Sequence, residues 1–265
     1  MKEIKDIYYT KTKNEEQSLD IYLPENDEFD VFLYFHGGGI ESGSKKDATY
    51  GKIAEHLTQK GYAVVSTEYR KYPGARFPEF LYDAAEAVAW VVNNISSYGK
   101  MKKLFVGGSS AGAYITMMLC FDKKYLESVG LTNSCINGYI HDAPQPTTHF
   151  NVLRERGIDT KKCIIDEAAP LYHIGDLSVE NVPPMLLICS VTDMACRYEQ
   201  MQLTYKTLLN FGFNDKVKFL IFENSTHCKY VGEQCLSGVI DAYISGRLKD
   251  YQVIDYNKYK ENPVL

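Results

Sequence analysis

A serine at the centre of a Gly-x-Ser-x-Gly pattern is the residue of this sequence best suited to covalent chemistry. Residues 108–112 read Gly-Ser-Ser-Ala-Gly, between an apolar run at 104–106 and a helix-like segment at 113–120. A serine on a sharp turn from a strand into a helix requires small flanking residues, because the backbone passes close by on both sides. Its hydroxyl attacks only when a base takes the proton. We therefore predict Ser110 as the nucleophile, and not Ser109, which is off the centre of the pattern.

A carboxylate to orient the base is predicted at Asp193. It follows an apolar run at 185–189 that reads as a buried strand. In open α/β sheets the ligand lies beyond the carboxyl ends of the strands, and a carboxylate there can hold an imidazole and stabilise its protonated form. The alternative is an ordinary turn or helix N-cap residue, a position that Asp favours. Glu199 and Asp166 are weaker candidates for the acid.

The base is predicted at His227. It follows the alternating strand-like run 217–222 and a turn-like stretch at 223–226, so it too lies beyond the carboxyl end of a strand. A single loop histidine is usually structural or solvated. The remaining candidates lack this placement; they are His56, His141, His149 and His173. Of these, His149 lies in the expected cap and can line a pocket there. Cys228, next to His227, is interpreted as a small buried hydrophobe.

A run of three glycines supplies candidate donors for an oxyanion. Residues 36–39 read His-Gly-Gly-Gly, directly after the apolar strand-like run 30–35. Backbone N–H groups in such a run face a ligand without side-chain obstruction, and two of them with the amide after the nucleophile would stabilise a tetrahedral intermediate. The alternatives are a flexible turn or a phosphate loop. The spacing that a phosphate loop requires is absent from residues 39–43.

Strand-like and helix-like segments alternate along the chain, which predicts an α/β fold with a mostly parallel central sheet and helices on both faces. The predicted strands are 18–23 (an exposed early strand), 30–35, 62–67, 103–106, 134–140, 185–189 and 217–222. The predicted helices are 50–60, 84–95, 113–120, 200–212 and 233–244.

The length and the lack of an interdomain linker favour one domain over two small ones. The whole chain, 1–265, is predicted as a single α/β domain. The stretch 142–181 is too long for an ordinary connection, so we expect a small cap or insertion within it. The lysine-rich N-terminal segment is interpreted as a solvated edge. No role is predicted for the tail after Lys249.

Composition excludes several classes of partner. The net charge of −5 argues against nucleic acid and against anionic membranes as partners. No apolar stretch approaches the ~20 residues of a membrane span, and the polar start of the sequence lacks a secretory signal, so a cytoplasmic protein is expected. Seven cysteines without paired spacing indicate no zinc site. The predicted chemistry needs no metal or organic cofactor, and no oligomeric state is predicted.

The four chemical parts, in the order glycine loop, serine, acid and histidine, resemble the α/β-hydrolase superfamily. Its esterase and lipase branch with the His-Gly-Gly-Gly motif, related to hormone-sensitive lipase, is the most similar. The likeness runs from about residue 20 to residue 244. It includes the hairpin-like residues 20–24 and a passage with Tyr69, Arg70, Pro73, Pro78 and Asp83.

The resemblance implies an α/β-hydrolase fold and assigns roles to six residues. These are Ser110 as nucleophile, Asp193 as acid, His227 as base, and the amides of Gly38, Gly39 and Ala111 as the oxyanion hole. Departures from the branch are Ser109 where Asp is usual, Ile40 where an aromatic residue is usual, and only 35 residues before His36, which leaves out that type's long N-terminal cap.

These departures favour a compact esterase, an acetyl esterase or an arylformamidase-like enzyme over a lipase, although Ile40 also tells against the formamidase group, in which tryptophan is common. The expected function is a serine carboxylic-ester hydrolase that acts on small, short-chain acyl or acetyl esters. The alternatives are a serine peptidase or amidase of the same fold, or a non-catalytic ligand-binding homologue.

Overall fold

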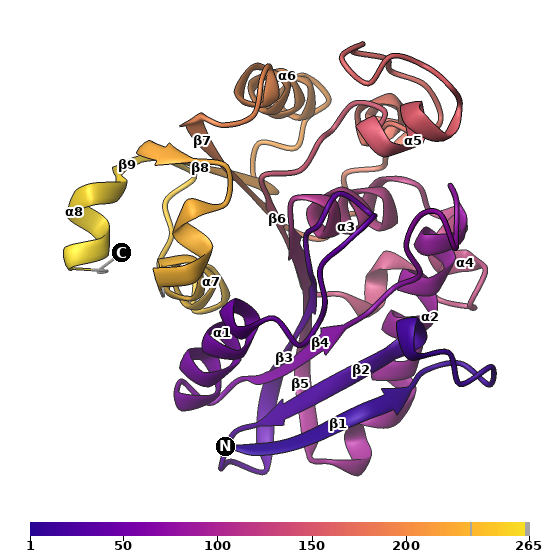
Figure 1. Cartoon of the computed structure of the whole chain (residues 1–265). Coiled ribbons are helices and arrows are strands. Elements are labelled where there is room, and N and C mark those ends of the chain that lie inside the picture. The colour runs from indigo at the N-terminus through magenta and orange to yellow at the C-terminus, as the bar shows by residue number, and fades with distance from the viewer. Residues whose placement is uncertain (234, 263–265) are drawn as a thin grey trace.

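A nine-stranded sheet forms the centre of the computed structural model, which describes residues 1–233 and 235–262 (Figure 1). Its order is β1-β2-β4-β3-β5-β6-β7-β8-β9; β2 is antiparallel to β1 and β4, and the other pairs are parallel. The strands are β1 (Lys2–Tyr8), β2 (Ser18–Leu23), β3 (Glu28–Phe35), β4 (Ala63–Thr67), β5 (Lys100–Ser109), β6 (Gly138–Asp142), β7 (Met185–Thr192), β8 (Val217–Thr226) and β9 (Tyr251–Asp255). The predicted mostly parallel α/β sheet is confirmed.

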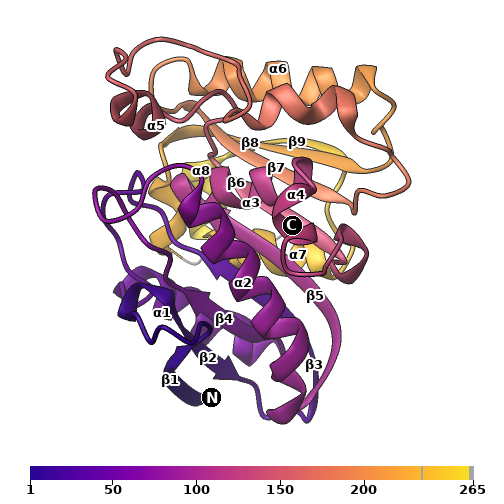
Figure 2. The same ribbon diagram turned by 90° about the vertical axis from the view of Figure 1, so that its right-hand side faces the viewer.

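Helices cover both faces of this sheet, as predicted. They are α1 (Ala48–Gln59), α2 (Glu79–Asn94), α3 (Ala111–Phe121), α4 (Lys124–Glu127), α5 (Phe150–Glu155), α6 (Arg197–Asn210), α7 (Cys235–Ile244) and α8 (Tyr256–Glu261). One core includes residues of α2, α3 and α6, and the other includes residues of α1, α7 and α8. In Figure 2, α2 lies in front of the strands, and α5 and α6 lie at the top.

The central strand β3 shows why its sequence is nearly all apolar. Val31, Leu33 and Phe35 pack into the core of α2 and α3, whereas Phe32 and Tyr34 pack into the core of α1 and α7. Successive side chains of a strand point to opposite faces, and both faces of this sheet are covered. The strand therefore carries no polar side that would face water.

The prediction that residues 18–23 form an exposed strand is wrong in its exposure. All six residues of β2 are buried. The N-terminal segment, interpreted as a solvated edge, forms β1 and pairs along the outer side of β2. Its charged residues mark it as an edge strand, in which one side of the backbone faces solvent.

Other boundaries also differ from the sequence-based expectations. Asn133–Cys135 form a 3-10 helix (η3), so β6 begins only at Gly138. Helix α2 begins at Glu79, five residues before the predicted start at 84. The tail forms β9 and α8. Of the predicted helix 233–244, α7 covers Cys235–Ile244, and residue 234 lies outside the described residues.

The long connection 142–181 contains α5 and a 3-10 helix, η4 (Pro170–Asp176). Its role as a cap on a single domain stays a prediction. Within residues 1–233 and 235–262, no helix combines the length and the apolar character needed to span a bilayer.

Candidate active site

Ser110 occupies the sharp turn between β5, which ends at Ser109, and α3, which begins at Ala111. Its φ of 54° and ψ of −113° lie in a region that side-chain-bearing residues rarely adopt. The Ser110 N–H donates to the carbonyl oxygen of Asp142 at 2.7 Å, and its carbonyl accepts from the Tyr114 N–H at 3.0 Å. These two backbone bonds hold the strained turn.

The two glycines of the pattern are required by the end of β3. A Cβ atom on Gly108 would lie 2.6 Å from the carbonyl oxygen of Phe35, and one on Gly112 would lie 2.0 Å from the same oxygen. Both distances are far inside van der Waals contact. The same close approach brings the glycine loop that follows β3 against the serine, since a Cβ on Gly37 would lie 3.3 Å from Cβ of Ser110.

The structure brings Ser110, His227 and Asp193 together. His227 Nε2 lies 2.8 Å from Ser110 Oγ, and His227 Nδ1 lies 2.6 Å from Asp193 Oδ1. With the proton on Nδ1, that nitrogen donates to the carboxylate and Nε2 accepts from the serine hydroxyl. The Asp193 side chain is fully buried and also accepts from the Met194 N–H at 2.6 Å.

Strand register explains why two residues so far apart in the chain meet. In the parallel pair β7–β8, Thr192 is the partner of Thr226. Asp193 and His227 are the residues that follow them, so each leaves its strand at the same level of the sheet edge. The predicted placement beyond the carboxyl ends of strands is what the structure shows; the catalytic roles of these residues stay predictions.

The weaker candidates for acid and base lie elsewhere. Asp166 accepts from Thr148 and Arg156, and Glu199 is exposed on α6. The histidines bond or pack away from Ser110: His56 with Ser237, His173 with the Glu167 carbonyl, and His149 as the N-cap of α5. His141 stacks on Tyr139 in the interior, where burial lowers its pKa to about 3.

The glycine loop turns back so that its amides remain available. Gly38 and Gly39 have φ values of 116° and 65°, and a Cβ on Gly38 would lie 2.1 Å from the Ser42 carbonyl oxygen. Within the described part of the chain, neither N–H of this pair donates to another protein group. The Ala111 N–H, in the first turn of α3, has no intrahelical acceptor.

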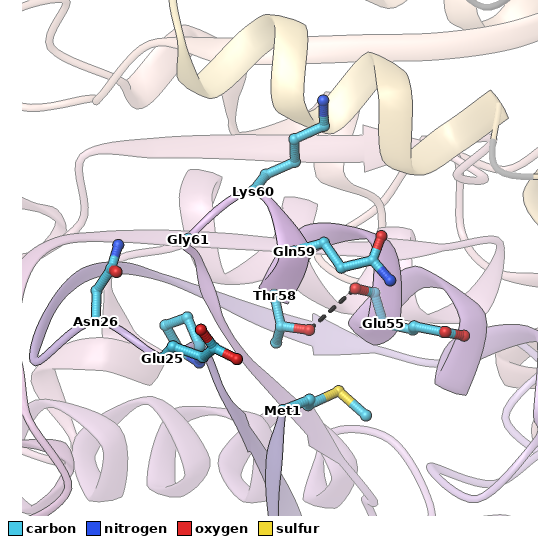
Figure 3. A pocket seen from close by; sticks show the side chains of 9 residues that line it. Met1, Glu25, Asn26, Glu55, Thr58, Gln59, Lys60 and Gly61 are labelled. Carbon is cyan, nitrogen blue, oxygen red and sulfur yellow. Dashed lines mark hydrogen bonds between the residues drawn. The ribbon is translucent and has the colours of Figure 1, made fainter.

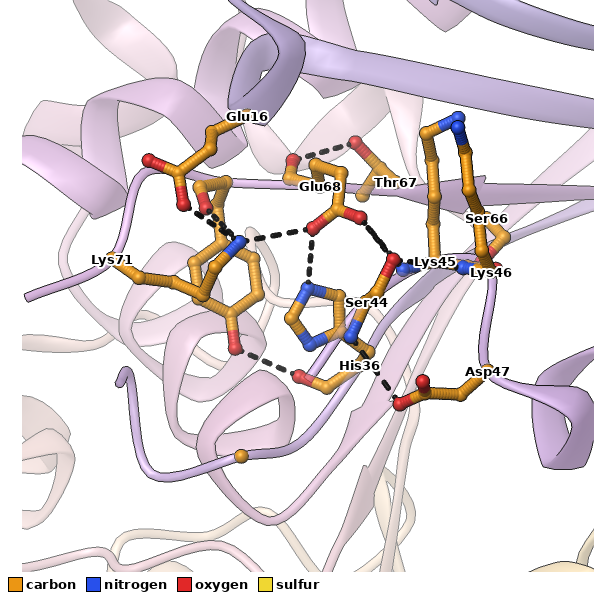
Figure 4. A network of polar contacts seen from close by, with 12 residues as sticks. Glu16, His36, Ser44, Lys45, Lys46, Asp47, Ser66, Thr67, Glu68 and Lys71 are labelled. Atoms are coloured by element: carbon orange, nitrogen blue, oxygen red, sulfur yellow. Dashed lines mark hydrogen bonds and ion pairs between the residues drawn. The ribbon is translucent and has the colours of Figure 1, made fainter. Parts of the chain in front are cut away.

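His36, the first residue of the loop motif, points toward Glu68 and anchors the loop (Figure 4). Its Nε2 lies 2.9 Å from Glu68 Oε2, and its ring stacks on Tyr69 with 4.6 Å between centroids. Glu68 also accepts from Ser44 Oγ at 2.6 Å and from Lys71 Nζ at 3.1 Å. Burial raises the pKa of Glu68, but these contacts outweigh burial and bring its pKa down to about 2. The carboxylate therefore stays ionised while it holds the loop.

A cavity of about 500 Å³ opens in front of Ser110. Its lining combines the glycine loop and the serine–histidine pair with mainly apolar walls: Gly37, Gly38, Gly39, Asp47, Thr49, Tyr50, Ser109, Ser110, Phe150, Met194, His227, Cys228 and Val231. The Tyr50 hydroxyl accepts from the Gly37 N–H at 3.1 Å, and burial raises the Tyr50 pKa to about 12. Burial likewise raises the pKa of the Cys228 thiol, so that it stays protonated 3.7 Å from His227 Nε2.

Helix α5, from the long connection, holds the glycine loop from the other side. The Phe150 ring lies where a Cβ on Gly39 would approach it to 2.9 Å, and Asn151 Nδ2 donates to the Gly39 carbonyl at 3.1 Å. Arg154 forms an ion pair with Glu41. Sequence reasoning missed Asn151 and Glu68, because a single polar residue carries no pattern that predicts such a contact.

A second cavity, of about 550 Å³, lies between the turn after β2 and the end of α1 (Figure 3). Its lining contains neither a serine nor a histidine: Met1, Pro24, Glu25, Asn26, Glu55, Thr58, Gln59, Lys60 and Gly61. Thr58 Oγ1 donates to the Glu55 carbonyl at 3.0 Å. Over residues 1–233 and 235–262, no group of three or more His, Cys, Asp or Glu side chains is placed to hold a metal ion.

The mostly parallel sheet with helices on both faces is an α/β-hydrolase fold. Within this class, the chain belongs to the BD-FAE family, which matches residues 19–153. The resemblance to α/β-hydrolase esterases seen in the sequence is thereby confirmed.

Curated relatives and solved structures agree with this class. The chain is 25% identical over 248 residues to a probable isoprenylcysteine alpha-carbonyl methylesterase (ICMEL1) of Arabidopsis thaliana, covering 84% of this chain and 51% of the relative. It is 30% identical over 141 residues to probable carboxylesterase 1 of the same plant, covering 46% and 44%. The chain thus spans about half the length of these relatives.

Two solved structures share the fold. A truncated carbohydrate esterase from gut microbiota superposes with a TM-score of 0.76 at 16% identity, covering 93% of this chain and 96% of that one. A thermophilic esterase of the planctomycete Thermogutta terrifontis superposes with a TM-score of 0.71 at 22% identity, covering 91% and 92%.

Proposed function

We propose that this protein hydrolyses carboxylic esters, with Ser110 as nucleophile, His227 as general base and Asp193 as the orienting acid. The observation that carries the proposal is the pair of contacts made by His227, at 2.8 Å to Ser110 Oγ and 2.6 Å to Asp193 Oδ1. Nucleophile, base and orienting carboxylate in hydrogen-bond sequence are what acyl transfer through a serine requires.

The reaction proceeds in two steps. Ser110 Oγ attacks the ester carbonyl carbon while its proton passes to His227 Nε2. The negative oxygen of the tetrahedral intermediate accepts hydrogen bonds from the amides of Gly38, Gly39 and Ala111. The bond to the leaving oxygen then breaks, and His227 returns the proton to the departing alcohol. Water attacks the acyl-enzyme in the same way and restores the free hydroxyl.

Small esters with short acyl chains are the proposed substrates. The cavity in front of Ser110 has a volume of about 500 Å³ and is bounded by Phe150, Met194 and Val231. A structure of the Thermogutta terrifontis esterase with bound butyrate supports this size of ligand, at 21% identity and a TM-score of 0.71.

Replacement of the nucleophile tests the proposal. Ser110→Ala should lower kcat/KM for p-nitrophenyl butyrate by about 10⁴-fold or more, because the attacking oxygen is lost. Ser128→Ala, at an exposed position, serves as the matched control with unchanged turnover. A fluorophosphonate probe should label the wild type at Ser110 and leave the variant unlabelled. Turnover by the folded Ser110→Ala variant contradicts the proposed nucleophile.

A substrate series defines the acyl and leaving groups. With p-nitrophenyl esters of two to twelve carbons, kcat/KM should be highest at two to four carbons, and matched anilides should react more slowly. A maximum at long chains contradicts the short-chain proposal. Faster turnover of the anilides indicates an amidase of the same fold, and an intact chain without labelling or turnover indicates a non-catalytic homologue.

A further inference from the structure

Asp142, the last residue of β6, carries a buried carboxyl group that the ester mechanism above does not use. The residue is 1% exposed. Its Oδ2 accepts from Ser109 Oγ at 2.5 Å, and its Oδ1 accepts from the Tyr230 hydroxyl at 2.5 Å. Both carboxyl oxygens are therefore bonded to protein hydroxyl groups, which offsets the cost of burying the carboxyl group.

The two hydroxyl partners belong to the two segments that must meet for catalysis. Ser109 immediately precedes Ser110, and it accepts in turn from the Tyr34 hydroxyl at 2.7 Å. Tyr230 lies three residues after His227, and its ring stacks on Phe222 with 4.3 Å between centroids. One carboxyl group thus joins the serine turn to the histidine loop.

The backbone of Asp142 adds a third connection. Its carbonyl oxygen accepts from the Ser110 N–H at 2.7 Å, which holds the serine in its left-handed conformation. In the pair that Ser110 forms with His227, the histidine side chain is 23% exposed. The next residue, Cys228, also has a positive φ, of 52°. The histidine loop is therefore a strained surface segment whose neighbour Tyr230 is tied to Asp142.

We propose that Asp142 is a positioning residue that holds Ser110 and His227 at reacting distance through Ser109 and Tyr230. The inference rests on the proposed ester hydrolysis and assigns to Asp142 no contact with substrate. Its physical basis is that transfer of the serine proton needs a short, aligned contact, and a displacement of about 1 Å can cost 10²-fold in rate. A tie between the two segments limits such displacements.

The charge of Asp142 also bears on its role. Burial raises the pKa of Asp142 to about 6, although the hydrogen bonds from Ser109 and Tyr230 act in the opposite direction. His227 favours the ionised carboxylate, and Asp193 disfavours it. The titratable groups that surround Asp142 are Tyr34, Cys189, Asp193, His227, Cys228 and Tyr230. Above pH 6 the carboxylate accepts hydrogen bonds from both hydroxyls. The protonated acid carries an O–H group, so it must donate in one of these two hydrogen bonds.

Asp142→Asn tests the proposal, because Asn keeps the size of the side chain but offers a single acceptor oxygen. For p-nitrophenyl butyrate at pH 8, kcat should fall about 10- to 100-fold while KM stays within about twofold, as expected for a displaced catalytic contact. Asp215→Asn, at an exposed position, is the matched control with wild-type kinetics. Circular dichroism establishes that both variants are folded.

The pH profile separates this role from a purely structural one. In the wild type, protonation of Asp142 should contribute to the fall of kcat/KM below pH 6. In Asp142→Asn this contribution should be absent, so the logarithm of kcat/KM should fall with a smaller slope over the same range. Wild-type kcat in Asp142→Asn, or the same slope in both proteins, overturns the proposal.

A double-mutant cycle decides the question if Asp142→Asn does not fold. Ser109→Ala and Tyr230→Phe each remove one hydroxyl and leave the carboxyl in place. Their effects on kcat should be non-additive, because both act through the same carboxyl group. Additive effects overturn the proposal. Retained turnover in Ser110→Ala would show that the proposed function itself is wrong. If Ser110→Ala is inactive and Asp142→Asn behaves like the wild type, only the role of Asp142 is rejected.

Discussion

Asn151 donates a hydrogen bond from Nδ2 to the carbonyl oxygen of Gly39 at 3.1 Å, across 112 positions of the chain. Asn151 is fully buried in α5, and Gly39 lies in the loop whose amides face the cavity in front of Ser110. The bond restrains the peptide that follows Gly39 and so helps to keep the glycine in its left-handed conformation, at a φ of 65°. The long connection between β6 and β7 thereby supports the proposed oxyanion hole.

Loss of this bond should lower the rate more than substrate binding. Asn151→Ala is expected to reduce kcat for p-nitrophenyl butyrate by about 10-fold, since one intramolecular hydrogen bond contributes on the order of 1 kcal/mol. KM should change little, because the oxyanion forms only after attack. Steady-state kinetics measure both constants, with Asn214→Ala at an exposed site as the control. A rise in KM with unchanged kcat contradicts this role.

The serine turn should not accept a methyl group at its second glycine. A Cβ on Gly112 would lie 2.0 Å from the Phe35 carbonyl oxygen, so Gly112→Ala should lower the free energy of unfolding by about 3 kcal/mol. Gly51→Ala should do the opposite. Gly51 is inside α1 with no atom within 4 Å of a Cβ at that position, so the variant should be up to about 1 kcal/mol more stable. Urea unfolding of both variants provides the comparison, and equal stabilities would be inconsistent with the packing described.

The buried carboxyl of Asp142 predicts a pH dependence of stability. Its pKa is about 6 in the folded protein against 3.8 for an ordinary aspartate, so the folded state holds this proton more tightly than the unfolded chain. The resulting stabilisation is complete below pH 3.8 and is lost as the pH rises through 6. Between pH 4 and pH 7, the wild type should lose about 2 kcal/mol relative to Asp142→Asn. Urea unfolding of both proteins across this range measures the difference, and parallel curves would contradict it.

The residues that support the site could not be predicted from the sequence, whereas the location of Ser110, Asp193 and His227 could. Each of these three residues comes after a strand-like run, and in parallel sheets the functional site lies beyond the carboxyl ends of the strands. No comparable rule applies to Asp142, which lies two residues beyond the predicted end of its strand, or to Asn151, which lies in a connection without regular pattern. A carboxyl or amide group has the same local appearance in a sequence whether it faces water or ties two loops together.

The edge strands illustrate the same limit in the fold. The apolar runs of β3 and β7 predict strands that are buried because both of their faces are covered, and the alternation in β8 also predicts a strand. β1 and β9 carry many polar residues, and their pairing partners, β2 and β8, supply the backbone hydrogen bonds that make them strands. The prediction that β2 is exposed is wrong because its burial depends on β1, and the sequence of β1 has the polar composition of a solvated segment.

By itself, the sequence determined the class of fold, the order of the main strands and helices, and the end of the sheet at which a serine, an acid and a histidine emerge, because these depend on local composition and on general rules of chain direction. Only the tertiary structure decided the distances among those side chains, the orientation of the glycine loop and the identity of its supports. Such features depend on strand register and on contacts between segments separated by tens of residues or more, and short-range sequence patterns carry no record of them.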